Sequence, residues 1–258
     1  MNNTDEQVLL TEISDGLARL TINRAEQMNT LNRALTAELK RTFSELTGNA
    51  DVRVVLLRAA GDKAFCAGAD LKEPRVHTAP RLEECLAGEP GVFDLMRRCR
   101  QIIISEVNGW AVGGGMQLAL FSDLTFASAG ARFKLPQVGL GIIPPYATTS
   151  RLARQIGQGR AMQMLLLGTT MGAEDAFRAG LVQGVAADAH ALHVQVEDTI
   201  RTLLALPPTS LAMAKNSLLS GLEMTSESAA EADRFRDYAL KQHKETTLAA
   251  GSSGSKHP

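Results

Sequence analysis

The chain has 258 residues, enough to bury a sizeable core as one large domain or as one domain with an appendage. Its 45% hydrophobic and 21% charged residues are typical of a soluble globular protein, and a formal net charge of −1 gives no indication of a nucleic-acid partner. We expect no membrane association, because no apolar run reaches the length of a membrane span. Three cysteines without metal-ligand spacing, behind a polar N-terminus, predict a cytoplasmic protein without a bound metal.

Hydrophobic periodicity predicts a regular alternation of strands and helices. Ser14-Asp15-Gly16 separates two β-rich runs and indicates a hairpin, whereas the proline- and glycine-containing segment 72–91 predicts a loop with a short helix beside a pocket. From residue 190 onward the pattern is helical, with a break at Pro207-Pro208. The predicted strands span 8–13, 17–22, 52–58, 102–107, 123–127 and 131–135, and the predicted helices span 32–46, 116–121, 149–156 and 159–167. This alternation favours an α/β fold with a mostly parallel, layered core.

The stretch Val107–Gln117 runs from the end of an apolar strand through three glycines into an apolar helix. Consecutive glycines allow a ligand to approach the backbone, and the first N–H groups of a helix are unpaired and carry partial positive charge. Such a place suits a developing oxyanion, although a tight turn or close helix packing would also call for glycines. The chain has no dinucleotide fingerprint, Walker A motif, G-x-S-x-G or H-E-x-x-H, so nothing favours a nucleotide, serine-hydrolase or zinc site.

Four segments, in the right order, resemble the signatures of the crotonase (enoyl-CoA hydratase/isomerase) superfamily. They are Asn23–Leu31 (N-R-x-x-x-x-N-x-L), Phe65–Leu71 (F-x-A-G-A-D-L), Asn108–Gly115 (N-G-x-A-x-G-G-G) and Gly139–Pro144 (G-L-x-x-x-P). The resemblance implies a crotonase-like core of repeated ββα units over residues 1–195 and a C-terminal helical region over 196–250. That region is expected to mediate a homotrimer or a dimer of trimers, followed by a disordered tail over 251–258.

Members of this superfamily share one catalytic device, in which two backbone N–H groups hold the carbonyl oxygen of an acyl thioester. By position, the two donors in this chain are Ala69 and Gly114. Fixed donors stabilise the charge that develops as an enolate or tetrahedral species forms, by about 3–4 kcal/mol per donor in comparable sites. The resemblance therefore implies an acyl-CoA substrate and no further cofactor.

The segment that contacts CoA in the superfamily corresponds to Ala67, Asp70, Leu71 and Lys72 of this chain, and Arg24 falls near it in the first motif. Lys72 and Arg24 are candidates for contacts with the CoA phosphates, because phosphates bind cationic side chains. Each is equally explained as a solvated surface charge.

The chain departs from the hydratases at the two positions where those enzymes carry glutamates, which are Gln117 and Gln137 here. A carboxylate can exchange a proton near neutral pH, whereas an amide cannot, and each such contribution is worth about 10²–10⁴ in rate. We therefore expect slow hydration of ordinary enoyl-CoA thioesters. Pro145 occupies the place of an aspartate found in some isomerases, and residues 147–149 replace glycines common in hydratases, which predicts a differently shaped acyl pocket.

Other side chains are candidates for supplying the missing proton. Tyr146 lies in the loop nearest the expected acyl end, although it is also expected as an aromatic wall of the pocket. Cys66 lies inside a signature motif, where a small buried side chain is favoured over a catalytic thiol. The remaining candidates, each expected to face solvent more often than the site, are His77, Glu83, Glu84, Asp94 and His243.

Two functions are compatible with an active site that keeps the expected oxyanion-hole donors but has glutamines at the positions of the catalytic glutamates. The first is an enzyme that stabilises a thioester enolate for decarboxylation, isomerisation or hydrolysis, which we favour. The second is a protein that binds acyl-CoA without converting it. The sequence does not name the acyl group.

Overall fold

The structure of the protein, a computed structural model, describes residues 7–73 and 90–253, with side chains up to residue 242. The chain divides into two compact units, Met1–Arg201 and Thr202–Pro258. The division falls inside helix α8 (Ala189–Leu204), a few residues after the predicted boundary at 195.

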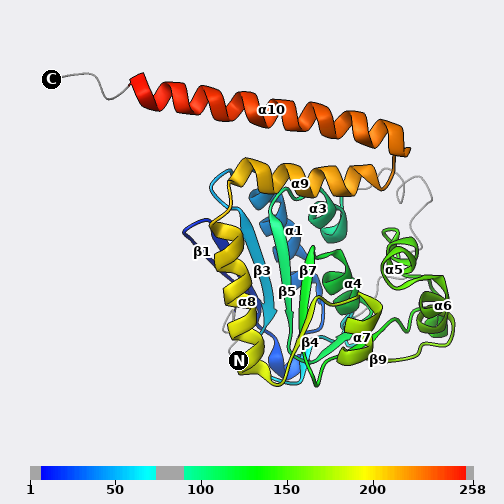
Figure 1. Ribbon diagram of the computed structural model, residues 1–258. Helices are drawn as coiled ribbons and strands as arrows, with labels where there is room; N and C mark the ends of the chain where they lie inside the picture. Colours follow the sequence, from blue (N-terminus) through cyan, green and yellow to red (C-terminus); the bar gives the residue numbers. More distant parts are fainter. Residues whose placement is uncertain (1–6, 74–89, 254–258) are drawn as a thin grey trace. The chain divides into compact units, whose positions relative to one another are not determined.

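The first unit contains two sheets among its described residues. The six-stranded sheet has the order β1-β2-β3-β5-β7-β10, in which β1 and β2 form the predicted antiparallel hairpin and the other pairs are parallel (Figure 1). The four-stranded sheet has the order β4-β6-β8-β9. The strands are β1 (Leu9–Ser14), β2 (Leu17–Ile22), β3 (Val54–Ala59), β4 (Ala64–Cys66), β5 (Ile102–Val107), β6 (Trp110–Val112), β7 (Leu124–Ser128), β8 (Arg132–Lys134), β9 (Met171–Gly172) and β10 (Gly184–Ala186).

The helices confirm the predicted pattern and extend it. The helices of the first unit are α1 (Arg33–Gly48), α3 (Val92–Arg98), α4 (Gly114–Phe121), α5 (Thr148–Ile156), α6 (Gln158–Leu166), α7 (Ala173–Ala179) and α8, with short 3-10 turns η1 (Ala25–Gln27) and η2 (Val138–Leu140). Helix α4 begins at Gly114, two residues before the predicted start, because the glycines themselves form its first turn. The α/β fold class is confirmed.

Strand β3 shows how the large sheet buries both faces. Because side chains alternate along a strand, Val55 and Leu57 point to one face and Val54 and Leu56 to the other, and all are fully buried. The first pair joins the main core with the apolar side of α1, while α8 lies along the opposite face (Figure 1). The ion pair between Arg19 of β2 and Glu197 of α8, at 2.8 Å, spans this second interface.

Glu106 of β5 is an acidic group buried under α8. Its Oε2 lies 3.5 Å from Nδ1 of His193. Burial raises the pKa of the Glu106 carboxyl above its ordinary value, although the charges of His193 and Arg58 oppose the shift and Glu197 adds to it. The folded state therefore binds this proton more tightly than the unfolded chain does. The resulting stability is present at acidic pH and is lost as the pH rises through the folded-state pKa.

We predict that Glu106→Gln, which resembles the neutral carboxyl, gains stability relative to the wild type as the pH rises from about 4 to about 8. Urea unfolding at several pH values measures this difference. Glu12→Gln, on the exposed end of β1, is the matched control and should show no such trend. A Glu106→Gln difference that stays constant with pH would contradict the assignment.

The second unit contains α9 (Pro208–Gly221) and α10 (Ser226–Ser253). As predicted, the proline pair separates α8 from α9, because Pro208 is tolerated only in the first turn of a helix. The two helices are joined by Arg236, which donates hydrogen bonds to Oγ of Ser220 at 2.8 Å and Oδ1 of Asn216 at 3.2 Å. Of the tail predicted from 251, the first three residues continue α10, and 254–258 lie outside the described residues.

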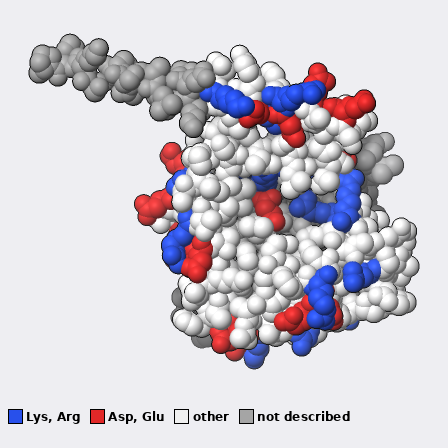
Figure 2. All heavy atoms as spheres, viewed as in Figure 1, with Lys and Arg blue, Asp and Glu red and all other residues white. Residues whose placement is uncertain are grey.

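On the face drawn in Figure 2, the charged side chains of the described residues lie in small groups that mix both signs, in keeping with a formal net charge of −1. Within the described part of the chain, none of the helices combines the length and the apolar character that a membrane crossing requires.

Candidate active site

The candidate site lies where β4 and β6 end side by side. These short strands pair in parallel, so the chain leaves both at the same edge of the small sheet. A Cβ placed on Gly68, whose φ is +94°, would lie 2.9 Å from the carbonyl oxygen of Val112 and 3.8 Å from the amide nitrogen of Gly114. A Cβ on Gly115 would lie only 1.9 Å from the carbonyl oxygen of Cys66. Two of the four signature motifs therefore meet at backbone contact, which only glycine permits.

The orientation of residue 69 follows from its pairing with the first motif. The N–H of Leu31 donates to the carbonyl of Gly68 at 2.7 Å, and the N–H of Asp70 donates to the carbonyl of Leu31 at 3.0 Å. Because alternate peptide groups of an extended segment point to opposite sides, the N–H of Ala69 faces away from Leu31. Gly114 is the first residue of α4, so its N–H has no partner within the helix. Within 7–73 and 90–242, neither amide has a hydrogen-bond acceptor.

The two glutamines flank this place. Gln117, one turn into α4, is 3% exposed, and its Nε2 donates to the carbonyl of Pro145 at 3.2 Å and to Oγ1 of Thr148 at 2.7 Å. Gln137 precedes η2 and is 7% exposed, and its Nε2 lies 3.6 Å from where a Cβ of Gly113 would stand. The Oε1 of Gln137 is a buried acceptor without a donor in the described part of the chain. Gln117 thus attaches the end of the segment 137–148 to α4, while the side chain of Gln137 at its start lies near Gly113.

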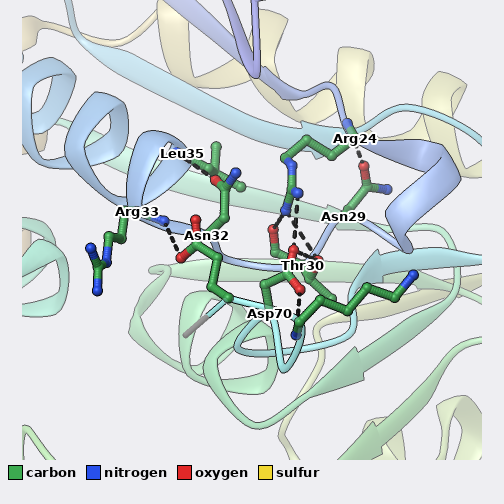
Figure 3. Close-up of polar contacts among 9 residues, drawn as sticks. Arg24, Asn29, Thr30, Asn32, Arg33, Leu35 and Asp70 are labelled. Carbon is green, nitrogen blue, oxygen red and sulfur yellow. Dashed lines mark hydrogen bonds and ion pairs between the residues drawn. The ribbon is translucent and has the colours of Figure 1, made fainter. Parts of the chain in front are cut away.

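Arg24 and Asp70 form an ion pair at the segment 67–72, which is expected to contact CoA. Figure 3 shows the Arg24 guanidinium directed at Asp70 and Thr30. Its Nη2 donates to Oδ2 of Asp70 at 3.0 Å, and its Nη1 donates to the carbonyl and hydroxyl oxygens of Thr30. The side chains of Arg24 and Asp70 are each 11% exposed. A phosphate contact by Arg24 stays a prediction, but the alternative of a simple solvated charge is wrong, because this guanidinium ties two motifs together.

The other residues of this segment are more open. Lys72 and Leu71 are exposed, and the backbone N–H of Lys72 donates to Oδ1 of Asp70 at 3.0 Å. The N–H of Ala67 donates to the carbonyl of Met28 at 3.0 Å. The exposed ammonium of Lys72 is accessible to an anion, so its contact with a CoA phosphate also stays a prediction.

We predict that Asp70→Asn destabilises the protein by about 1–3 kcal/mol at neutral pH, because it removes a charged acceptor from the partly buried Arg24. The hydrogen bond from Arg24, aided by the backbone N–H of Lys72 and the hydroxyl of Thr30, holds the pKa of Asp70 below its ordinary value. That stability is present above the ordinary aspartate pKa and is lost as the pH falls through the folded-state pKa.

The destabilisation of Asp70→Asn should therefore shrink as the solution is acidified, which thermal or urea unfolding at several pH values will show. Asp51→Asn, at an exposed position, is the control with an expected change near zero. Equal stability of the Asp70→Asn variant and the wild type at neutral pH would refute the role of this ion pair.

The structure shows where the other candidate proton carriers of the described residues lie. Tyr146 packs on Phe93 with ring centroids 5.3 Å apart, and a Cβ on Gly91 would lie 2.7 Å from its hydroxyl, so its ring forms a wall beside α3. Asp94 caps α3 by accepting the N–H of Gly91 at 3.2 Å. Burial raises the pKa of the Cys66 thiol to about 12, which keeps it protonated, as expected for a buried filler. His77, Glu83, Glu84 and the side chain of His243 lie outside the described residues.

Sequence reasoning missed two polar residues that support the site. Asn29 is 1% exposed, and its Nδ2 donates to the carbonyls of Ala60 and Ala64, at 2.9 and 2.7 Å, which fixes the start of β4. Thr148 receives the amide of Gln117 and is fully buried. The only sequence signals were the place of Asn29 in the first motif and the place of Thr148 within residues 147–149, where the resemblance implies glycines in hydratases.

Comparison with known proteins assigns the chain to a family. The sequence model of the enoyl-CoA hydratase/isomerase family matches residues 12–252. The chain belongs to the enoyl-CoA hydratase/isomerase family. Among its relatives, the crotonyl-CoA hydratase of Syntrophomonas wolfei is 33% identical over 229 residues, which cover 88% of both chains. The (E)-benzylidenesuccinyl-CoA hydratase of Thauera aromatica is 35% identical over 222 residues, 84% of both.

Solved structures of the family have the same fold. The enoyl-CoA hydratase of Bacillus anthracis superposes with a TM-score of 0.81, at 28% identity and over 97% of both chains. Membership of the enoyl-CoA hydratase/isomerase family confirms the resemblance first drawn from the four motifs.

Proposed function

We propose that this family member is an acyl-CoA-dependent enzyme that stabilises a thioester enolate between the N–H groups of Ala69 and Gly114. The observation that carries the proposal is the contact between the end of β4 and the start of α4, where both amides are without an acceptor in the described residues. Two donors fixed by strand pairing and by a helix terminus need little reorganisation as charge develops on the carbonyl oxygen.

We further propose that the protein is not an efficient hydratase of simple enoyl-CoA thioesters. Gln117 and Gln137 offer amide groups where a hydratase needs carboxylates, and an amide neither takes nor returns a proton near neutral pH. Decarboxylation makes the smallest demand on such a site, because loss of CO₂ itself generates the enolate. Isomerisation or hydrolysis requires a further group, for which Tyr146, in the loop whose residues Pro145 and Thr148 bond to Gln117, is the candidate.

The test is a parallel assay of this protein and the crotonyl-CoA hydratase of Syntrophomonas wolfei with crotonyl-CoA, 3-butenoyl-CoA and malonyl-type CoA esters, followed by mass spectrometry. We expect this protein to hydrate crotonyl-CoA more slowly than that hydratase, by a factor of about 10²–10⁴. We also expect it to convert one of the other thioesters. Hydration at a comparable rate would overturn the proposal that carboxylates are needed at positions 117 and 137.

A second candidate function, acyl-CoA binding without turnover, is favoured by one observation: within the described part of the chain, both hydrogen bonds of the Gln117 side chain go to the loop at 145–148. Calorimetric binding of thioesters without conversion across the panel would support it. Conversion that is abolished by Tyr146→Phe would exclude it.

A further inference from the structure

The side chain of Gln117 is held in a closed group of hydrogen bonds. Its Nε2 donates to the carbonyl oxygen of Pro145 at 3.2 Å and to Oγ1 of Thr148 at 2.7 Å, and the Thr148 hydroxyl donates to the same carbonyl. Three donor hydrogens thus serve two acceptors, in a place where Gln117 is 3% exposed and Thr148 is fully buried. The two side chains are therefore shielded from water, whereas Pro145 is an exposed residue and the bonds to its carbonyl are partly buried.

The two residues between Pro145 and Thr148 have an unfavourable backbone conformation with positive φ angles. Tyr146 has φ +64° and Ala147 has φ +58°, the left-handed region that L-residues with a Cβ adopt at a cost of about 1–2 kcal/mol each. Such a conformation persists only where the surroundings hold it. The bonds of Gln117 hold the residues on both sides of this pair, Pro145 and Thr148, against α4.

The conformation of this loop sets the position of an aromatic wall. The Tyr146 ring lies 5.3 Å from the Phe93 ring, centroid to centroid, and the Phe93 ring lies 5.4 Å from that of Phe121 at the end of α4. The Tyr146 hydroxyl reaches the N-terminus of α3 at Gly91. Helix α4 therefore supports the wall at two points, through Gln117 and through Phe121.

We propose that Gln117 is a positioning residue whose amide fixes the loop at 145–148, and thereby the Tyr146–Phe93 wall, so that it sets which acyl chains the site accepts. The proposal rests on the proposed function, because it concerns the acyl pocket of that same site. Position 117 in this chain holds a pocket wall in place of exchanging protons.

The hydrogen-bond count explains why a carboxylate does not substitute for this amide. A carboxylate at position 117 would only accept, so the group would keep one donor, the Thr148 hydroxyl, for the carbonyl of Pro145 and the carboxylate together. Two negatively polarised oxygens would then face each other in a partly buried place. A buried acceptor left without a donor costs about 1–3 kcal/mol, and more when it is charged.

The experiment measures affinities of free CoA, butyryl-CoA and octanoyl-CoA by calorimetry for the wild type, Gln117→Glu, Thr148→Val and Thr148→Ser. We expect the octanoyl-to-butyryl affinity ratio to change by about tenfold in Gln117→Glu and Thr148→Val, with affinity for free CoA kept. Thr148→Ser retains the hydroxyl and should retain the ratio of the wild type. The change in Gln117→Glu should be smaller at pH 5 than at pH 8, because the protonated carboxyl regains a donor.

The outcomes separate this proposal from the one on which it rests. A wild type that binds both thioesters no more tightly than free CoA contradicts the proposed function and this inference with it. Tighter thioester binding by the wild type, with the same ratio in Gln117→Glu and Thr148→Val, contradicts the positioning role alone. Loss of free CoA binding in a variant, with lost cooperative unfolding, would assign Gln117 to general stability and would also overturn the proposal.

Discussion

Gly115→Ala is expected to disrupt the site more severely than alanine at any other glycine of the described residues. The added Cβ would lie 1.9 Å from the carbonyl oxygen of Cys66 and 2.7 Å from its carbonyl carbon, both backbone atoms that cannot rotate away. Either α4 or β4 must move, and with it the backbone contact between the two motifs. We expect a loss of at least about 3 kcal/mol in the free energy of unfolding, the upper range for overpacking of a core, together with loss of acyl-CoA binding.

Gly48→Ala is the matched control, because a Cβ at the end of α1 meets nothing within 4 Å. It should leave both stability and binding close to wild type or raise stability slightly, since alanine is the better helix former. Urea unfolding and calorimetric titration with butyryl-CoA measure both quantities. A Gly115→Ala protein with wild-type stability and affinity would show that β4 and α4 are not packed as the structure has them.

The long elements were predictable because each carries its own signal. The run Val54–Leu57 is apolar on both faces, as a strand covered by helices on both sides must be, and the leucines of α1 repeat at helical spacing. The strands that build the site, β4 and β6, have three residues each and are too short to show a period. Only the glycines that follow these two strands indicated a functional site at this edge of the small sheet.

The polar contacts of the site were beyond sequence reasoning because they join distant residues. Gln117 bonds to residues 28 and 31 positions away, and Arg24 pairs with Asp70 across 46 positions. No sequence periodicity links such partners, and a glutamine in a helix can be solvent-exposed as readily as buried. The sequence thus singled out Gln117 by its place after the glycine motif, whereas the structure shows what it contacts.

Two variants of Gly114 distinguish the effect of losing its N–H from the effect of adding a Cβ. Gly114 is the first residue of α4, where proline is well tolerated because its missing N–H has no helical partner. Gly114→Pro therefore removes the donor, and Gly114→Ala keeps it while adding a Cβ. In both variants that Cβ meets only the end of the flexible Leu31 side chain, at 2.6 Å.

We expect Gly114→Pro to lower the turnover of any converted thioester by a further factor of about 10²–10³ relative to Gly114→Ala, the usual cost of one oxyanion-hole donor. A measurement that needs no turnover is the infrared carbonyl stretch of bound butyryl-CoA labelled with ¹³C at the thioester carbon. Donation from two amides should shift this band to lower frequency in the wild type and in Gly114→Ala, and the shift should diminish in Gly114→Pro. Equal bands in the two variants, with both folded and binding, would mean that the amide of residue 114 does not contact the thioester oxygen, because proline has no N–H at that atom and carries its ring Cδ there instead.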